Sequence, residues 1–273
     1  MVDYLQNLDS ESAVIHAIEA NTAGFLLSMG KAGGGEEKHT PEITWTIGGS
    51  PLDYHNAVVH ADLTTETAAL TIREVISLMK AKNVPGSWHL SPNMHPADLG
   101  TYLDANGFEY VGDEPGMAAY LPTLNIPPMP EGFRVERVQD AQSLKHWETT
   151  LGRGFGEGIK EAQWVTGVYA KIGLDDSVPW RHFLGLQDGE PVATTSLYLG
   201  AGVAGIYFVS TVPSARRRGI GAAITAAALQ HALEMGYQVG ILGASSDGFP
   251  VYQRLGFRQF CTFRLYVTTY PIR

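Results

Sequence analysis

The sequence predicts a mixed α/β fold that is built from two similar halves. Segments with strand-like alternation and segments with helical spacing follow each other along the chain, which is typical of a sheet covered by helices. Residues 122–130 hold four prolines, which exclude a helix interior and a central strand there. At 273 residues, the chain is long enough for two domains. We therefore expect one domain at residues 1–121, a linker at 122–131 and a second domain at 132–273.

The second half shows its elements most clearly. Residues 133–138 alternate as a strand, and Asp140 is placed to cap the helix that follows. Asp188-Gly189 lies between two apolar runs, which is a strong hairpin pattern. Gly236 is placed to end a long alanine-rich helix. These patterns predict strands at 133–138, 181–187, 191–199, 205–211, 239–244 and 260–267, and helices at 140–151, 160–171, 221–235 and 248–255.

The first half repeats part of this order. Strand and helix patterns alternate at residues 56–60, 64–81, 87–90 and 97–106. The last of these helices is closed by Gly107-Phe108, as the last helix of the second half is closed by Gly256-Phe257. The shared order indicates an internal duplication. Residues 30–38 contain four glycines and are expected to form a surface loop.

Composition and charge exclude several classes of protein. The single cysteine, Cys261, cannot form an intramolecular disulfide, and the histidines show no metal-ligand spacing. The net charge is −9, and residues 1–130 carry 5 basic against 16 acidic side chains, which argues against a nucleic-acid surface. Neither a signal peptide nor an apolar run of about 18 residues is found. We expect a soluble, cytoplasmic protein without a metal, and we leave open whether it is a monomer or a homodimer.

One segment of the second half carries the pattern of an anion site. A predicted strand ends near Pro213, three arginines follow, and two glycines open the next helix. The first turn of a helix has N–H groups without intrahelical partners, and glycines let a bulky anion approach them. A nucleoside-triphosphatase loop is excluded because no G-x-x-x-x-G-K-[ST] occurs. The dinucleotide pattern is weak, because Gly219-Ile-Gly221 is not followed by x-x-Gly. We predict a pyrophosphate site here.

These residues resemble a known family. Arg216-Arg-Arg-Gly219-Ile-Gly221 fits the [QR]-x-x-G-x-[GA] motif of the GNAT superfamily of acetyl-CoA-dependent N-acetyltransferases. Tyr252-Gln-Arg-Leu-Gly256-Phe257 resembles the Y-x-x-x-G-F segment of the same family. The resemblance covers residues 132–268 well and residues 45–121 faintly. It implies two GNAT-like domains in tandem, each with a mixed, mostly antiparallel central sheet flanked by helices. The first copy has Leu103 where the tyrosine would lie and should be inactive.

The resemblance also implies roles for single residues. The backbone of Val209, Ser210 and Thr211 would pair with the pantetheine arm of coenzyme A, beside a sheet that splays open. Tyr252 would face the cofactor sulfur. The remaining residues expected to bind the cofactor are Arg216, Arg217, Arg218, Gly219, Ile220, Gly221, Ala222 and Ser245. Ser245 replaces a frequent asparagine, and Gly205, which has no side chain, lies where some members carry a glutamate base.

We expect an N-acetyltransferase that moves acetyl from acetyl-CoA to a primary amine by direct attack on the thioester. A small-molecule acceptor is favoured over a protein, and nucleic acid or membrane partners are not expected. Phe155, Trp164 and Tyr169 are candidates for an aromatic wall of the acceptor site. The general base stays open among Glu157, Glu161, His182 and water. Two alternatives stay open as well, a non-catalytic acyl-CoA-binding module or sensor, and a scaffold that binds no cofactor.

Overall fold

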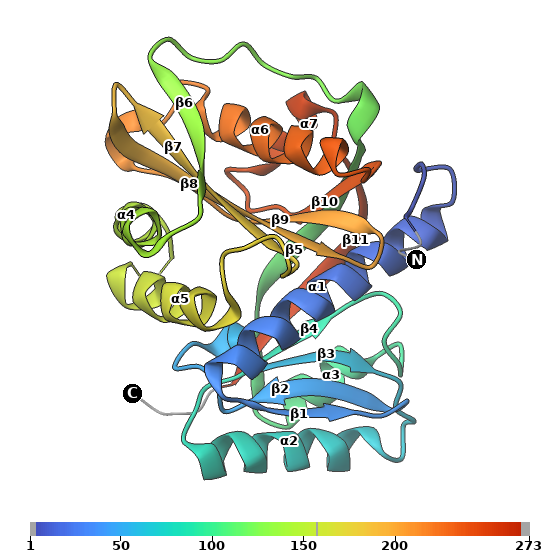
Figure 1. The fold of residues 1–273 in the computed structure, drawn as a ribbon. Coiled ribbons are helices and arrows are strands. Elements are labelled where there is room, and N and C mark those ends of the chain that lie inside the picture. The colour runs from blue at the N-terminus through green and yellow to red at the C-terminus, as the bar shows by residue number, and fades with distance from the viewer. Residues whose placement is uncertain (1–3, 157, 269–273) are drawn as a thin grey trace. The chain divides into compact units, whose positions relative to one another are not determined.

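The computed structural model describes residues 4–156 and 158–268 (Figure 1). The chain divides into two compact units, and each unit is made from two segments of the chain. Unit 1 comprises Met1–Asn21 and Pro115–Phe260. Unit 2 comprises Thr22–Glu114 and Cys261–Arg273. No helix among the described residues combines the length and the apolar character that a membrane crossing requires.

Unit 1 contains the expected mixed sheet. Its strands are β6 (Phe133–Val138), β7 (Trp180–Gln187), β8 (Glu190–Gly200), β9 (Val203–Thr211), β10 (Val239–Gly243) and the last part of β5 (Phe108–Tyr120). The strand order is β5-β10-β9-β8-β7-β6, and only the β9–β10 pair of this sheet is parallel. The strands predicted at 133–138, 181–187, 191–199, 205–211 and 239–244 are thereby confirmed.

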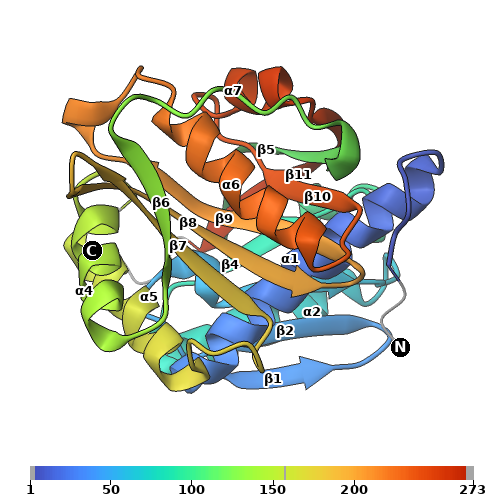
Figure 2. The same cartoon turned by 45° about the horizontal axis from the view of Figure 1, so that its top comes forward.

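Helices cover both faces of this sheet. They are α4 (Ala141–Gly152), α5 (Ile159–Ile172), α6 (Ile220–Glu234) and α7 (Phe249–Leu255). Figure 2 shows α6 lying across the strands of the sheet. Ala204 and Ile206 of β9 share a hydrophobic cluster with Ala226 and Leu229 of α6. Because side chains alternate along a strand, Gly205 and Tyr207 face the opposite side.

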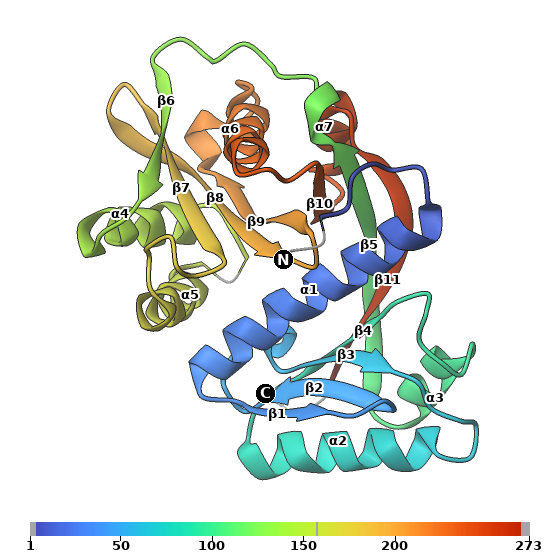
Figure 3. The same cartoon turned by 45° about the vertical axis from the view of Figure 1, so that its right-hand side comes forward.

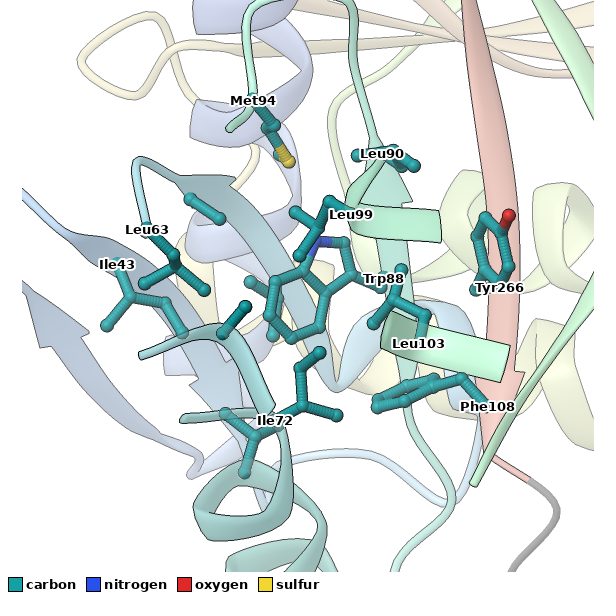
Figure 4. Close-up of a cluster of buried hydrophobic side chains, with 14 of the residues drawn as sticks. Ile43, Leu63, Ile72, Trp88, Leu90, Met94, Leu99, Leu103, Phe108 and Tyr266 are labelled. Carbon is teal, nitrogen blue, oxygen red and sulfur yellow. The ribbon is translucent and has the colours of Figure 1, made fainter. Parts of the chain in front are cut away.

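Unit 2 is a smaller sheet with its own core. Its strands are β1 (Glu36–His39), β2 (Ile43–Ile47), β3 (Ala57–Ala61), β4 (Ser87–Leu90) and the last part of β11 (Arg258–Thr268), in the order β1-β2-β3-β4-β11, and the first part of β5 also belongs to this unit. Helices α2 (Ala68–Lys82) and α3 (Leu99–Ala105) pack on it. Trp88 lies at the centre of the core, with Ile72, Leu99 and Phe108 around it (Figure 4).

The two halves of the chain exchange their last strands. Strand β5 begins in unit 2, but from Pro115 onward it belongs to unit 1, where Met117 pairs with Leu242 of β10. Strand β11 begins in unit 1, but from Cys261 onward it belongs to unit 2, where Leu265 pairs with His89 of β4. Figure 3 shows both strands as long continuous ribbons. The division therefore differs from the linear one expected at 1–121, 122–131 and 132–273, because each half of the chain contributes the last part of one strand to the sheet of the other unit.

The order of elements supports the duplication. Strand β3, helix α2, strand β4 and helix α3 follow each other in the first half, as β9, α6, β10 and α7 do in the second. The β3–β4 pair is parallel, like the β9–β10 pair. The N-terminal region differs from expectation, because helix α1 runs over Glu11–Gly33 and β1 begins at Glu36. The loop expected at residues 30–38 is therefore only a short turn.

Candidate active site

The sheet of unit 1 opens along strand β9. Strand β10 pairs with β9 at Ala204, Gly205 and Ile206 only, whereas β9 continues to Thr211. Strand β8 pairs with the other edge of β9 from Val203 to Thr211, so from Tyr207 onward the edge of β9 that faced β10 has no strand pairing. A strand edge that continues beyond its neighbour presents main-chain N–H and C=O groups to a ligand. The opening therefore forms where the family resemblance implied it, beside Val209, Ser210 and Thr211.

A strained bulge lies at the start of this opening. The β8–β9 register shifts between Thr194 and Ser196, so that two residues of β9 oppose one of β8. Phe208 has φ 52°, which costs a bulky residue on the order of 1–3 kcal/mol. Its buried ring packs against Trp147 and Tyr169, with ring centroids 6.1 and 6.3 Å away, and this packing offsets the strain. The bulge places the side chains of Tyr207 and Phe208 on the same face.

The far end of the opening leads into the turn before helix α6, residues 216–221, which we call the glycine turn. Arg217 and Gly219 adopt φ 60° and φ 80°, and helix α6 then begins at Ile220 without a capping side chain. Successive left-handed and right-handed residues turn N–H groups toward one point, as in anion-binding nests. A Cβ at Gly221 would meet only Thr211 Oγ1, at 3.6 Å. The protein's own packing therefore does not require this glycine, and the room in front of it suits a phosphate.

The three arginines differ in their roles. Arg216 Nε donates to the Thr211 carbonyl at 3.0 Å, and Arg216 Nη2 donates to the Gly154 carbonyl at 2.9 Å. Arg216 thus ties the glycine turn to the end of β9 and to the α4–α5 loop. Arg217 and Arg218 are exposed. We expected all three to add charge beside the anion, and the structure gives Arg216 a positioning role in addition.

Tyr252 lies on helix α7, inside a hydrophobic cluster. Its side chain is 8% exposed, and its ring lies 6.0 Å from that of Phe257. Burial raises its pKa to about 12. A Cβ at Gly248 would come within 2.8 Å of the Tyr252 ring, so this glycine makes the room for it. Ser245 Oγ accepts from the Gly248 N–H at 3.2 Å, which gives Ser245 a local role at the start of α7.

The expected aromatic wall is only partly present. Phe155 is half-buried, and its ring lies 5.8 Å from that of Phe208. Trp164 is half-buried on α5. Tyr169, in contrast, is fully buried and donates to Ser196 Oγ at 3.3 Å. Tyr169 therefore belongs to the core and not to an exposed wall, because its hydroxyl has a partner inside the unit.

The candidate bases are not brought together at the opening. Burial lowers the pKa of His182 to about 3, and its Nδ1 lies 2.8 Å from Ser196 Oγ, so it is a poor base near neutral pH. Glu161 is 2% exposed and lies beside Gly156 in the α4–α5 loop. Glu157 lies outside the described residues. In the described part of the chain, no group of three or more His, Cys, Asp and Glu side chains could hold a metal ion.

Sequence reasoning missed one residue at this site. A Cβ at Gly205 would lie 2.1 Å from Asn21 Oδ1 and 2.6 Å from Tyr207 Cε2. The space in which some GNAT members place a glutamate is therefore filled by Asn21, which comes from helix α1. Asn21 is fully buried and bonds to Tyr207. No local pattern could reveal it, because its partners lie about 180 residues away along the chain.

Comparison with known proteins identifies the part of the chain that forms this opening. Residues 146–257 match the model of the acetyltransferase (GNAT) family. These residues form a GNAT domain. The match begins in helix α4 and ends after α7, so it contains the bulge, the glycine turn and Tyr252. No curated protein matches the chain.

Solved structures with the same fold extend over most of the chain. A GCN5-related N-acetyltransferase from Kribbella flavida is 20% identical, with a TM-score of 0.69 over 90% of this chain and 95% of that one. A functionally unknown protein from Staphylococcus epidermidis is 15% identical, with a TM-score of 0.67 over 86% and 94%. A tandem GNAT protein from the clavulanic acid biosynthesis pathway is 12% identical, with a TM-score of 0.54 over 72% and 67%. At such identities the likeness shows the fold.

Unit 2 shares the topology of the GNAT domain but not its site. Strand β3 pairs with β4 at Ala57 and Val58 only, which resembles the short β9–β10 pairing. The R-x-x-G-x-G motif does not occur in the first half of the chain. Leu103 of α3 is fully buried in the core of this unit. The chemistry that the sequence supports is therefore concentrated in the GNAT domain.

Proposed function

We propose that the protein transfers acetyl from acetyl-CoA to a primary amine, with a small molecule as acceptor. The observation that carries this proposal is the opening between β9 and β10. It begins after Ile206, runs along a strand edge and ends at the uncapped glycine turn of α6. A strand edge suits the amide-bearing pantetheine arm, and an uncapped helix start suits a pyrophosphate.

The described residues fit coenzyme A along this line. The main chain of Val209, Ser210 and Thr211 would pair with the arm, and the N–H groups of residues 217–222 would hold the pyrophosphate. Ser210 Oγ is buried without a hydrogen-bond partner in the protein. The space before Gly221 is free of neighbouring protein atoms within van der Waals distance, apart from Thr211 Oγ1. Bound acetyl-CoA supplies the thioester.

In the reaction that we propose, the amine nitrogen forms a bond to the acetyl carbon, and the carbon–sulfur bond breaks. The nitrogen loses a proton to water, and the thiolate leaves. Main-chain N–H groups next to the bulge would polarise the thioester oxygen, and such a donor contributes about 10²–10³ in rate. We propose that the strained backbone at Phe208 holds these N–H groups in position before the substrate binds.

Tyr252 would stabilise the departing thiolate with a hydrogen bond. A thiol has a pKa near 8.5 and Tyr252 one of about 12, so complete proton transfer would be uphill by about 5 kcal/mol. A hydrogen bond to a developing charge needs no such transfer and contributes about 1.5–3 kcal/mol. Tyr252 therefore acts as a donor that keeps its proton, and the proton that the thiolate takes up comes from solvent.

The acceptor would enter from the face that carries α4 and α5. Phe155 and Trp164 would line its path, because both are half-buried there and Phe155 packs on the bulge residue Phe208. An aromatic face attracts the cationic form in which an alkylamine arrives. We propose a small molecule over a protein tail as the acceptor.

A substitution at Gly221 tests coenzyme binding. In Gly221→Val the branched side chain would fill the space before the glycine turn, while the fold has room for its Cβ. We expect the dissociation constant for coenzyme A, measured by calorimetry, to rise by at least about tenfold. Gly167→Val on α5 is the matched control, because no atom lies within 4 Å of its Cβ position. Equal affinity in both variants would contradict the proposed cradle.

A non-catalytic acyl-CoA sensor is the second candidate. It is favoured by one observation, the absence of a carboxylate at Gly205, whose space Asn21 fills. Both candidates bind acetyl-CoA, so binding does not separate them. Release of free thiol from acetyl-CoA in the presence of amino acids, polyamines and aminoglycosides does separate them. Thiol release above the rate with water identifies the enzyme, and its absence with intact binding identifies the sensor.

A further inference from the structure

Helix α2 and the strands β1 and β2 border a cavity in unit 2. Figure 1 shows α2 running beside these two strands. The cavity has a volume of about 140 Å³. A single water molecule needs only about 10–15 Å³. The cavity therefore has room for a small organic molecule.

The walls of this cavity are largely apolar. Strand β2 contributes Ile43 and Trp45, and helix α2 contributes Val75 and Leu78. Ile43 and Val75 are buried, and both belong to the hydrophobic core of unit 2. Trp45 and Leu78 are half-buried and pack against the same core. Because the core holds these side chains in place, the apolar walls are present before any ligand enters.

Four polar side chains at the cavity have no partner within the described protein. They are Lys38, Trp45, Thr71 and Glu74. In residues 4–156 and 158–268, neither a hydrogen bond nor an ion pair engages the ammonium group, the indole N–H, the hydroxyl or the carboxylate of these four side chains. Small-molecule sites combine apolar walls with a few polar groups that converge on the ligand. The cavity offers both.

The two charges at the cavity have opposite sign and come from different walls. Lys38 lies on β1, directly across from Trp45 in the β1–β2 register, whereas Glu74 lies on α2. Both charged side chains are exposed, and no ion pair joins them in the part of the chain that the structure describes. The ammonium and indole groups can only donate hydrogen bonds, and a carboxylate can only accept them. The strand wall therefore suits an anionic group and the helix wall a cationic one.

We propose that this cavity binds a free α-amino acid with a small apolar side chain. The carboxylate of the ligand would pair with Lys38 and the Trp45 N–H. Its ammonium group would pair with Glu74 and the Thr71 hydroxyl, and its side chain would lie on the apolar walls. A ligand with only one charge would leave one wall unpaired, so the site discriminates in favour of a zwitterion. This inference goes beyond the proposed transferase function and does not depend on it.

Three compounds of similar size test the requirement for both charges. They are L-valine, 3-methylbutanoate, which lacks the ammonium group, and 2-methylpropylamine, which lacks the carboxylate. Calorimetry with the full-length protein gives the dissociation constant of each compound. We expect L-valine to bind with a dissociation constant of about 1 mM or lower. Each single-charge compound should bind about tenfold more weakly, because it loses one charge-assisted interaction.

Two variants test whether the amino acid binds in this cavity. Lys38→Met keeps the length of the side chain and removes its charge, and Glu74→Gln keeps the shape and removes the charge. Each should weaken the binding of L-valine by about tenfold. Both side chains are exposed, so the urea midpoint of either variant should stay unchanged. Lys80→Met is the matched control, because Lys80 is exposed on α2 and does not line the cavity.

The outcomes separate this inference from the proposed function. Failure of L-valine to bind, or equal binding of the three compounds, would overturn the inference. Undiminished binding of L-valine to Lys38→Met and Glu74→Gln would do so as well, because the amino acid would then bind elsewhere, for example as an acceptor at the GNAT domain. Failure of coenzyme A to bind the unchanged protein would overturn the proposed function alone. Tenfold weaker L-valine binding in both variants, with the affinity of Lys80→Met unchanged, supports the inference.

Discussion

The close approach of Gly205 and Asn21 leads to a quantitative prediction. In Gly205→Ala the new Cβ would lie 2.1 Å from Asn21 Oδ1, whereas an ordinary contact is longer by more than 1 Å. Either Asn21 or strand β9 has to move. Overpacking of a buried site costs about 1–3 kcal/mol, and each hydrogen bond of Asn21 that is lost costs about 1 kcal/mol more. We expect a total loss of about 3 kcal/mol in the free energy of unfolding.

The double variant provides the decisive measurement. Asn21→Ala alone should cost a similar amount, because it removes a buried carboxamide from three carbonyls and from the Tyr207 hydroxyl. In Gly205→Ala/Asn21→Ala the closest clash is gone, so the two losses should fall short of additivity by at least about 1 kcal/mol. Urea-induced unfolding, followed by circular dichroism, gives the three values. Strict additivity would refute the steric reasoning, since independent sites add and residues in contact do not.

Three further predictions concern catalysis, acid stability and the division of the chain. Tyr252→Phe should lower turnover by about tenfold or more at unchanged coenzyme A affinity, because it removes a donor to the departing thiolate; unaltered turnover would exclude that role. Burial lowers the pKa of His182 to about 3 from the ordinary 6.5, so this side chain is neutral in the fold. Its contribution to the free energy of unfolding is fully present above pH 6.5 and is lost as the pH falls toward 3. Between pH 7 and pH 5 this loss is about 2 kcal/mol, and the urea midpoint of His182→Gln should depend less on pH over that range. The fragment 131–273 should lack a cooperative unfolding transition, because β10 loses its partner β5. Co-expression with the fragment 1–130 should restore the transition. Cooperative unfolding of the fragment 131–273 alone would contradict the strand exchange.

Local patterns were sufficient for most of the GNAT domain. Three features could be predicted from a few neighbouring residues each, and all three appear in the structure. They are the alternation of residues 133–138, the Asp188-Gly189 turn and the glycine that ends α6. The glycine turn was found in the same way, because its conformation depends on Arg217 and Gly219 themselves.

What the sequence did not reveal depends on distant partners. Helix α1 was not predicted, because its apolar residues are spread around the helix and do not form one stripe. The exchange of β5 and β11 was not predicted either, because alternation marks a strand but does not name its neighbour, and Met117 pairs with a residue about 125 positions away. Asn21 was missed for the same reason, since an asparagine in a helix has no distinguishing pattern of its own.

The exchanged strands impose an order on folding during synthesis. The sheet of unit 2 receives its fifth strand only when residues 261–268, close to the end of the described chain, have been made. At about 5–20 residues per second, the ribosome needs roughly 8–30 s to add the residues between Glu114 and Thr268. During this interval strand β4, which is buried in the folded unit, has one edge without its partner strand, and such edges promote aggregation. A nascent chain of this design should therefore depend on chaperones more strongly than two domains that close one after the other.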